Sequence, residues 1–358
     1  MIQPKTGYIR INRFGATTAE EFTAALKELQ KQGMKDLILD LQGNGGGYLN
    51  AAIDLANEFL QQKELIVYTE GRTSQRSNFY AKGTGNFKNG RLIVLVDEYS
   101  ASASEIVTGA IQDWDRGVVV GRRTFGKGLV QRPIELPDGS MIRLTIARYY
   151  TPSGRCIQKP YDHTANLDGR GLSKDDGQEK YNMELVDRFN RGEMMHADSI
   201  HFPDSLKNST KKLKRTVYGG GGIMPDYFVP IDTTQYTDYH RNLVAKGVVI
   251  KATTKNIEKN RKELQEKYKK FDTFNNKFEI DEQMLADIRA AADKEKIEFN
   301  EEQYNKSLPL IKTQLKALIA RDLWDMNEYF QVINTTNNSV QQALELLNEK
   351  IYEKKLPL

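Results

Sequence analysis

The stretch that decides the fold is residues 92–105, LIVLVDEYSASASE, in which an apolar run leads into small and acidic residues. Five consecutive apolar residues are typical of a strand that is buried on both faces of a sheet. A helix is predicted to follow, over residues 104–114. Apolar runs at residues 37–41 and 118–120, with helical spacing in residues 18–32, repeat this alternation. We therefore expect an α/β core with a parallel sheet and flanking helices.

The rest of the chain follows different patterns. A turn sequence, LPDG at residues 136–139, separates two alternating runs and predicts an added β-hairpin. Residues 158–222 are polar, and we expect a surface excursion with a short helix near residues 182–190. After residue 234 the chain is rich in Lys and Glu with helical spacing. We expect a core of residues 1–234 and an α-helical C-terminal domain of residues 235–358.

Composition excludes several classes of protein. The chain has 358 residues, is 39% hydrophobic and carries 52 basic against 48 acidic residues, which argues against disorder and against a nucleic-acid partner. Cys156 is the single cysteine and the four histidines do not pair at ligand spacing, so we expect no disulfide, metal or cofactor. No apolar run approaches the roughly 20 residues of a membrane span. The chain begins almost at once with a strand pattern, and we expect the signal peptide to lie upstream.

A sharp turn between a strand and a helix places a hydroxyl group at Ser102. Backbone N–H groups and the positive end of the helix lie near such a turn, and both suit a developing oxyanion. Ser102 with Glu105 also matches a helix-capping box, so this motif alone does not define a chemistry.

Two glycine-rich segments accompany the predicted turn at Ser102. Lys127 lies between Gly126 and Gly128, as in a surface turn or a phosphate loop, but Gly128 stands where a phosphate loop requires Ser or Thr. Residues 43–47, GNGGG, follow a strand and precede a helix without the register of a dinucleotide-binding loop. Such a loop can equally present N–H donors to a carbonyl oxygen.

Together these segments resemble one family, the C-terminal processing peptidases, also called tail-specific proteases. Residues 100–105, SASASE, match its nucleophile motif, and residues 124–128, TFGKG, with Gln131 match its lysine motif. Lys127 lies 25 positions after Ser102, as in the family. Further matches are DLQGNGGG at residues 40–47, YYTPSGR at residues 149–155 and GGIMPD at residues 221–226. The resemblance covers about residues 7–230.

The resemblance implies a crotonase-like core and a serine endopeptidase that cleaves near the C-terminus of exported proteins, in the bacterial periplasm or cell envelope. It implies Ser102 as the nucleophile, Lys127 as the general base and Gln131 as the amide that orients the lysine. The backbone N–H groups of Ala103 and of Gly46 or Gly47 would be the oxyanion donors. It implies no metal or cofactor. Asp113 is an alternative third member, and Ser100 and Ser104 are alternative nucleophiles.

A lysine acts as a base only when it is neutral. Its ordinary pKa is about 10.4, so function near pH 7 needs a shift of about 3 units, or about 4 kcal/mol. Burial among apolar groups supplies such a shift, and Gln131 would orient the amine without adding a negative charge. A carboxylate from Asp113 would raise the pKa of the lysine instead.

The sequence departs from the family at Gln42-Gly43, where Arg-Asn is usual, and we expect the family's PDZ domain to lie upstream of this chain. Two other functions remain open: a peptide-binding scaffold, and acyl-CoA chemistry on a crotonase-like core. The expected partners are proteins with accessible C-terminal tails. A second copy of the chain is also expected, because the C-terminal helices carry an apolar stripe that must be covered: Leu310, Leu315, Leu318, Ile319 and Leu323.

Overall fold

The computed structural model describes residues 1–159, 176–349 and 351–356. This part of the chain forms two compact units. The first is Met1–Pro230 together with Gln342–Leu358, and the second is Ile231–Gln341. Each unit is described by itself below.

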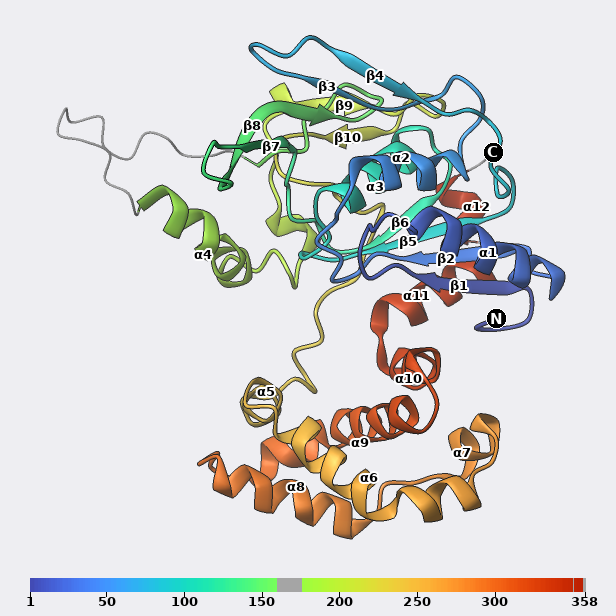
Figure 1. The fold of residues 1–358 in the computed structure, drawn as a ribbon, viewed down its shortest axis with the longest axis vertical. Helices are drawn as coiled ribbons and strands as arrows, with labels where there is room; N and C mark the ends of the chain where they lie inside the picture. Colours follow the sequence, from blue (N-terminus) through green and yellow to red (C-terminus); the bar gives the residue numbers. More distant parts are fainter. Residues whose placement is uncertain (160–175, 350, 357–358) are drawn as a thin grey trace. The chain divides into compact units, whose positions relative to one another are not determined.

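A parallel sheet of five strands forms the centre of the first unit (Figure 1). Its order is β1-β2-β5-β6-β11, and every neighbouring pair is parallel. The three apolar runs of the sequence therefore lie side by side as β2, β5 and β6. The strands are β1 (Thr6–Arg10), β2 (Asp36–Asp40), β5 (Leu92–Val96), β6 (Val118–Gly121) and β11 (Tyr227–Phe228).

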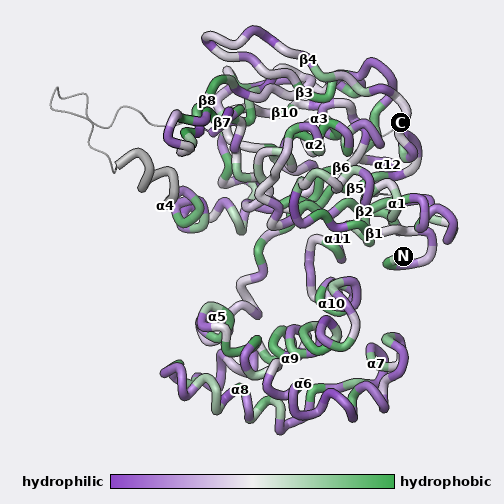
Figure 2. Tube along the Cα trace, in the orientation of Figure 1, coloured by the Kyte–Doolittle hydropathy of each residue, from purple (hydrophilic) through white to green (hydrophobic). Residues whose placement is uncertain are grey.

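Three helices follow strands of this sheet: α1 (Thr18–Lys31) after β1, α2 (Leu49–Asn57) after β2, and α3 (Ala103–Asp113) after β5. Their apolar side chains form one core with alternate strand residues such as Leu39 and Val94. Ile38 and Ile93 point to the opposite face and are also fully buried. Figure 2 shows hydrophobic residues along these central strands. Burial on both faces is what the apolar runs predicted.

A second sheet is antiparallel, with the order β4-β3-β8-β7. Its strands are β3 (Leu65–Glu70), β4 (Ser77–Tyr80), β7 (Leu129–Glu135) and β8 (Met141–Tyr150). The last two form a hairpin around residues 136–139, where Gly139 adopts φ 81° and donates its N–H to the carbonyl of Leu136. The predicted hairpin is therefore present. A two-stranded sheet of β9 (Lys207–Ser209) and β10 (Thr216–Tyr218) completes this unit.

The last residues of the chain correct the expected domain boundary. Helix α11 (Asn338–Asn348) begins in the second unit, but residues 342–358, including α12 (Ile351–Lys355), belong to the first. Tyr352 is 3% exposed, and its hydroxyl accepts the N–H of Leu92 at 3.1 Å. The helical domain expected at residues 235–358 therefore ends at Gln341, because the apolar side chains after it are buried against the core.

The polar segment at residues 158–222 is not only a surface excursion. Its helix, α4 (Asp176–Asn190), is longer than expected, and short 3₁₀ turns follow at Ala197–Ser199 and Asp204–Leu206. Several of its polar side chains are buried, among them Arg188 at 1% and Thr210 at 0% exposure. Ion pairs and hydrogen bonds to backbone groups make this burial possible, and the hydropathy of the sequence gives no sign of these contacts. The part of the prediction that falls on residues 160–175 lies outside the described residues.

The second unit is helical. It contains α5 (Asp238–Ala245), α6 (Val248–Lys267), α7 (Phe271–Lys277), α8 (Glu282–Lys294), α9 (Glu301–Leu323), α10 (Met326–Ile333) and a 3₁₀ turn at Asn334–Thr336. It has its own hydrophobic core. Leu315, Leu318 and Ile319, from the stripe that motivated the predicted dimer, are buried in that core.

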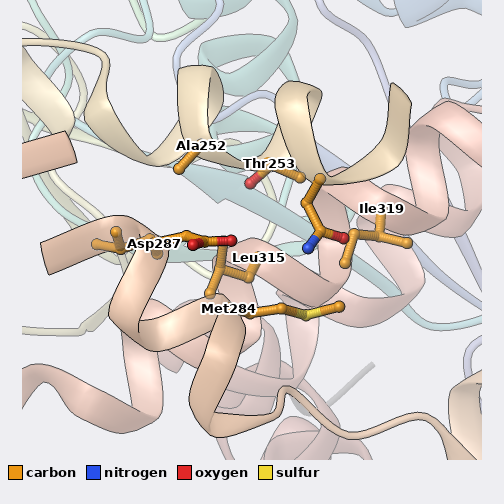
Figure 3. Close-up of a pocket in the computed structure, with 8 residues that line it drawn as sticks. Ala252, Thr253, Met284, Asp287, Leu315 and Ile319 are labelled. Carbon is orange, nitrogen blue, oxygen red and sulfur yellow. The ribbon is translucent and has the colours of Figure 1, made fainter. Parts of the chain in front are cut away.

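A small cavity lies between α6, α8 and α9 in this unit (Figure 3). Ala252, Met284, Asp287 and Leu315 are among its lining residues, and its volume of about 10 Å³ is that of one water molecule. It is too small for a peptide or cofactor. None of the helices in the described part of the chain combines the length and apolar character needed to cross a bilayer.

Candidate active site

Three loops lie at the carboxyl ends of β2, β5 and β6, which are neighbours in the parallel sheet. We call them the glycine loop (residues 41–48), the serine loop (residues 97–102) and the lysine loop (residues 122–128). Carboxyl ends of parallel strands meet at one edge of a sheet, which is where ligands bind in open α/β folds. The topology therefore brings the three predicted motifs together.

Hydrogen bonds join the serine loop to both neighbours. Ala101 donates its N–H to the carbonyl of Asn44 at 3.0 Å, and Ser100 donates its hydroxyl to the carbonyl of Leu41 at 2.8 Å. On the other side, the N–H of Phe125 in the lysine loop donates to the carbonyl of Ser100 at 3.0 Å. The serine loop is therefore held between the other two.

Ser102 occupies a strained position directly before α3. Its φ of 57° and ψ of −112° are rare for a residue with a side chain and cost about 1–3 kcal/mol. The residue is partly exposed, whereas its neighbours Ala101 and Ala103 are buried. Ala103 is the first residue of α3, where N–H groups have no partner inside the helix. A hydroxyl group thus stands beside helix N–H donors.

The backbone of the glycine loop lies so close to the turn at Ser102 that no side chain fits between them. A Cβ atom on Gly46 would lie 2.8 Å from the Cβ of Ser102 and 2.9 Å from the nitrogen of Ala103. Gly46 also has a φ of 95°, which favours glycine. A Cβ on Gly47 would lie 2.1 Å from the carbonyl oxygen of Phe14. These contacts explain why glycines occupy both positions.

Glu105 joins the serine loop to the lysine loop. Its side chain is fully buried. Its Oε2 accepts the N–H of Ser102 and the N–H of Lys127, both at 2.8 Å. Its Oε1 accepts the hydroxyl of Thr124 at 2.5 Å and the N–H of Gly126 at 2.7 Å. Burial raises the pKa of the Glu105 carboxyl, and these donors oppose that rise.

One oxygen of Glu105 accepts a hydrogen bond from each of the two candidate catalytic residues and so sets the distance between their backbones. The backbone nitrogens of Ser102 and Lys127 are each 2.8 Å from Oε2 of Glu105, so they lie no more than about 6 Å apart. The capping contact predicted for Glu105 is present, because its side chain accepts the N–H of the N-cap residue Ser102. Its contacts with the lysine loop are long-range, and only the folded chain shows them.

Two further polar residues support the loops, and the sequence did not single them out. Asn44 is fully buried, donates its amide to the carbonyl of Ile11 at 2.6 Å and accepts the N–H of Gly46 at 2.8 Å. Asp97 accepts the N–H of Gly43 at 2.9 Å and that of Ser100 at 3.1 Å. Burial raises the pKa of Asp97. For Asp97 the available signal was a polar side chain directly after a buried strand, whereas Asn44 lies four residues beyond the end of β2.

The remaining candidates take different positions. Gln131 is exposed on β7, opposite Thr145 of β8, and its contact with the amine of Lys127 stays a prediction. Asp113 lies at the far end of α3, about 16 Å along the helix axis from Ser102 at 1.5 Å per residue. There it pairs with Arg155 at 2.8 Å, which gives it a role in packing.

The alternative nucleophiles are both fully buried and already hydrogen-bonded. Ser100 donates to the carbonyl of Leu41, and Ser104 donates to the carbonyl of Asn44 at 2.9 Å. Ser102 is the hydroxyl of this run with exposed surface. A strained, accessible serine beside helix N–H groups is the arrangement that the nucleophiles of acyl-transfer enzymes share.

Comparison with known proteins finds two family matches. Residues 5–164 match peptidase family S41. Residues 239–325 match a second family, whose function is unknown. The first match includes all three loops, and the second lies within the helical unit.

Curated relatives carry related names. A carboxyl-terminal-processing protease of Picosynechococcus sp. is 46% identical over 155 residues, which are 43% of this chain and 37% of the relative. The carboxy-terminal processing protease CtpB of Bacillus subtilis is 37% identical over 153 residues, 43% of this chain and 32% of the relative. The chain thus spans about a third of the length of these relatives. A solved photosystem II D1 C-terminal processing protease is 38% identical, with a TM-score of 0.40, over 42% of this chain and 39% of that one.

Proposed function

We propose that this chain is a serine endopeptidase that cleaves near the C-terminus of exported proteins, on a core of the crotonase kind. The observation that carries the proposal is the shared oxygen of Glu105, which fixes the backbone of Ser102 and of Lys127 within about 6 Å. A lysine side chain extends about as far as that separation, so its amine can reach the serine hydroxyl. The names of the S41 relatives support the same activity.

In the proposed reaction, Ser102 Oγ attacks the carbonyl carbon of the scissile peptide bond, and its proton passes to the neutral amine of Lys127. The tetrahedral intermediate carries its negative charge on the former carbonyl oxygen. When it collapses, the C–N bond breaks and the leaving amine takes the proton from Lys127. Water, deprotonated by the same lysine, then hydrolyses the acyl-enzyme. Gln131 is proposed to orient the amine.

The oxyanion is proposed to accept the N–H of Ala103 and the N–H of Gly47. Of the two glycines considered from the sequence, Gly46 already donates its N–H to Asn44 at 2.8 Å. Gly47 is the next residue of the same loop. Each such donor contributes about 3–4 kcal/mol to transition-state stabilisation in related chemistry.

Labelling with a fluorophosphonate probe tests the proposal. We expect mass spectrometry to find the label on Ser102, with neither Ser100 nor Ser104 modified, and labelling to slow at least about 100-fold in Lys127→Ala. A fluorogenic peptide with a free C-terminus should lose turnover in the same variant while the far-UV circular dichroism stays unchanged. Label on Ser104, or an unchanged rate in Lys127→Ala, would contradict the proposed mechanism.

A further inference from the structure

Arg188, in the last turn of α4, contacts the backbone of the lysine loop through carbonyl groups, whereas Glu105 contacts it through N–H groups and a hydroxyl. It is 1% exposed, although it belongs to the polar segment expected on the surface. Its guanidinium donates to the carbonyl of Arg123 at 2.7 Å and to the carbonyl of Thr124 at 3.3 Å. These two carbonyls directly precede the Phe-Gly-Lys sequence of the lysine loop.

A carboxylate holds this arginine in place. Oε2 of Glu193 lies 3.4 Å from Nε of Arg188 and accepts a hydrogen bond from Arg123 at 2.6 Å. Arg123 also donates to the carbonyl of Gly221 at 2.7 Å. Burial, and then the charge of Arg123, lowers the pKa of Arg188 to about 10, so it remains a cation at neutral pH. Glu193 therefore allows two arginines to be buried side by side.

A carboxylate and a guanidinium thus hold the lysine loop, the first through backbone N–H groups and the second through backbone carbonyls. The N–H groups of Gly126 and Lys127 donate to the carboxylate of Glu105, while the carbonyls of Arg123 and Thr124 accept from Arg188. Hydrogen bonds to charged groups are about twice as strong as neutral ones. Two such anchors on five consecutive residues fix both the position and the rotation of the backbone that carries the lysine.

Helix α4 is also linked to the same loop through Lys159. Lys159 forms an ion pair with Glu184 of α4, and its ammonium lies 4.1 Å from the ring centroid of Phe125. The N–H of Lys159 donates to the carbonyl of Gly126 at 2.9 Å. The match to family S41 ends at residue 164, before α4 begins.

We propose that Arg188 is a positioning residue for the base Lys127, so that α4 and the turn after it complete the active site from outside the segment that matches the family. The inference rests on the proposed function, because it assigns Arg188 a role through Lys127. It requires that loss of the guanidinium lets the lysine loop shift. A misplacement of about 1 Å can lower a catalytic rate about 100-fold.

The test is a double-mutant cycle that measures acylation of Ser102 by the fluorophosphonate probe in Arg188→Ala, Lys127→Ala and the double variant. We expect Arg188→Ala to lower the maximal labelling rate about 10- to 100-fold without changing the half-saturating probe concentration. The double variant should label no more slowly than Lys127→Ala, because both changes remove the same base. Asp187→Ala, at the exposed neighbouring position of α4, is the matched control and should label at the wild-type rate.

Arg188→Lys keeps the proposal testable if the alanine variant does not fold. Lysine retains the charge but cannot span both carbonyls, so we expect labelling about 3- to 10-fold slower than wild type. A wild-type rate in either Arg188 variant, or full additivity with Lys127→Ala, overturns the positioning role. If wild-type Ser102 is not labelled, or Lys127→Ala labels at the wild-type rate, the proposed function itself fails, and the inference fails with it for that separate reason.

Discussion

Replacing Glu105 by glutamine tests whether one buried carboxylate holds the serine and lysine loops together. Glutamine has the same shape but carries an amide NH₂ in place of one oxygen. At the Oε2 position that NH₂ would face two backbone N–H groups, those of Ser102 and Lys127. At the Oε1 position it would face the N–H of Gly126 and the hydroxyl of Thr124. A hydroxyl can turn and accept a hydrogen bond, so the second orientation is the less costly.

The magnitude follows from the bonds that are lost in this orientation. The N–H of Gly126 keeps no acceptor, which costs about 1–3 kcal/mol for a buried group. The bonds from Ser102 and Lys127 change from charged to neutral, which weakens each by about 1 kcal/mol. We therefore expect Glu105→Gln to lower the free energy of unfolding by about 3–5 kcal/mol. Because the same bonds position the lysine, acylation of Ser102 should slow about 10- to 100-fold.

Urea unfolding followed by circular dichroism measures the first effect, and the fluorophosphonate labelling rate measures the second. Glu28→Gln is the control, since Glu28 is exposed on α1 and such surface changes stay within about 0.5 kcal/mol. The reasoning is refuted if Glu105→Gln unfolds within about 1 kcal/mol of the wild type and labels at the same rate, because a carboxylate with four donors cannot be replaced so cheaply.

Three other predictions follow from single features. Lys127→Arg should be as inactive as Lys127→Ala towards a fluorogenic peptide, because a guanidinium does not deprotonate near neutral pH, and measurable turnover would exclude the lysine as base. Burial lowers the pKa of His240, whose ring lies 3.1 Å from Gln314, so the unfolded chain binds the proton more readily. Stability should therefore fall as the pH drops below about 6.5, and a thermal unfolding series in which His240→Gln keeps the same slope would contradict this. We also propose that the helical unit, residues 231–341, mediates a dimer through exposed side chains such as Ile250. Light scattering that reports a single 40.9 kDa chain at tens of micromolar would refute it.

The sequence alone predicted the elements that depend on local pattern. Three apolar runs indicated β2, β5 and β6, because a strand covered on both faces carries apolar side chains at most of its positions. Turn chemistry at residues 136–139 indicated the β7–β8 hairpin. The order and spacing of the serine, lysine and glycine motifs pointed to the C-terminal processing peptidases, and curated relatives that match the chain carry that name. Each of these signals is contained in a few neighbouring residues.

Only the tertiary structure showed which distant groups meet. Glu105 bonds with Lys127 across 22 positions, and Arg188 bonds with Thr124 across 64. Neither contact leaves a local periodicity, and both side chains have the polar character of surface residues. The return of residues 342–358 to the core escaped prediction for the same reason, since an amphipathic helix does not specify which surface covers its apolar face. Local sequence thus sets the strands and turns, whereas the pairing of buried charges is decided by the fold that brings them together.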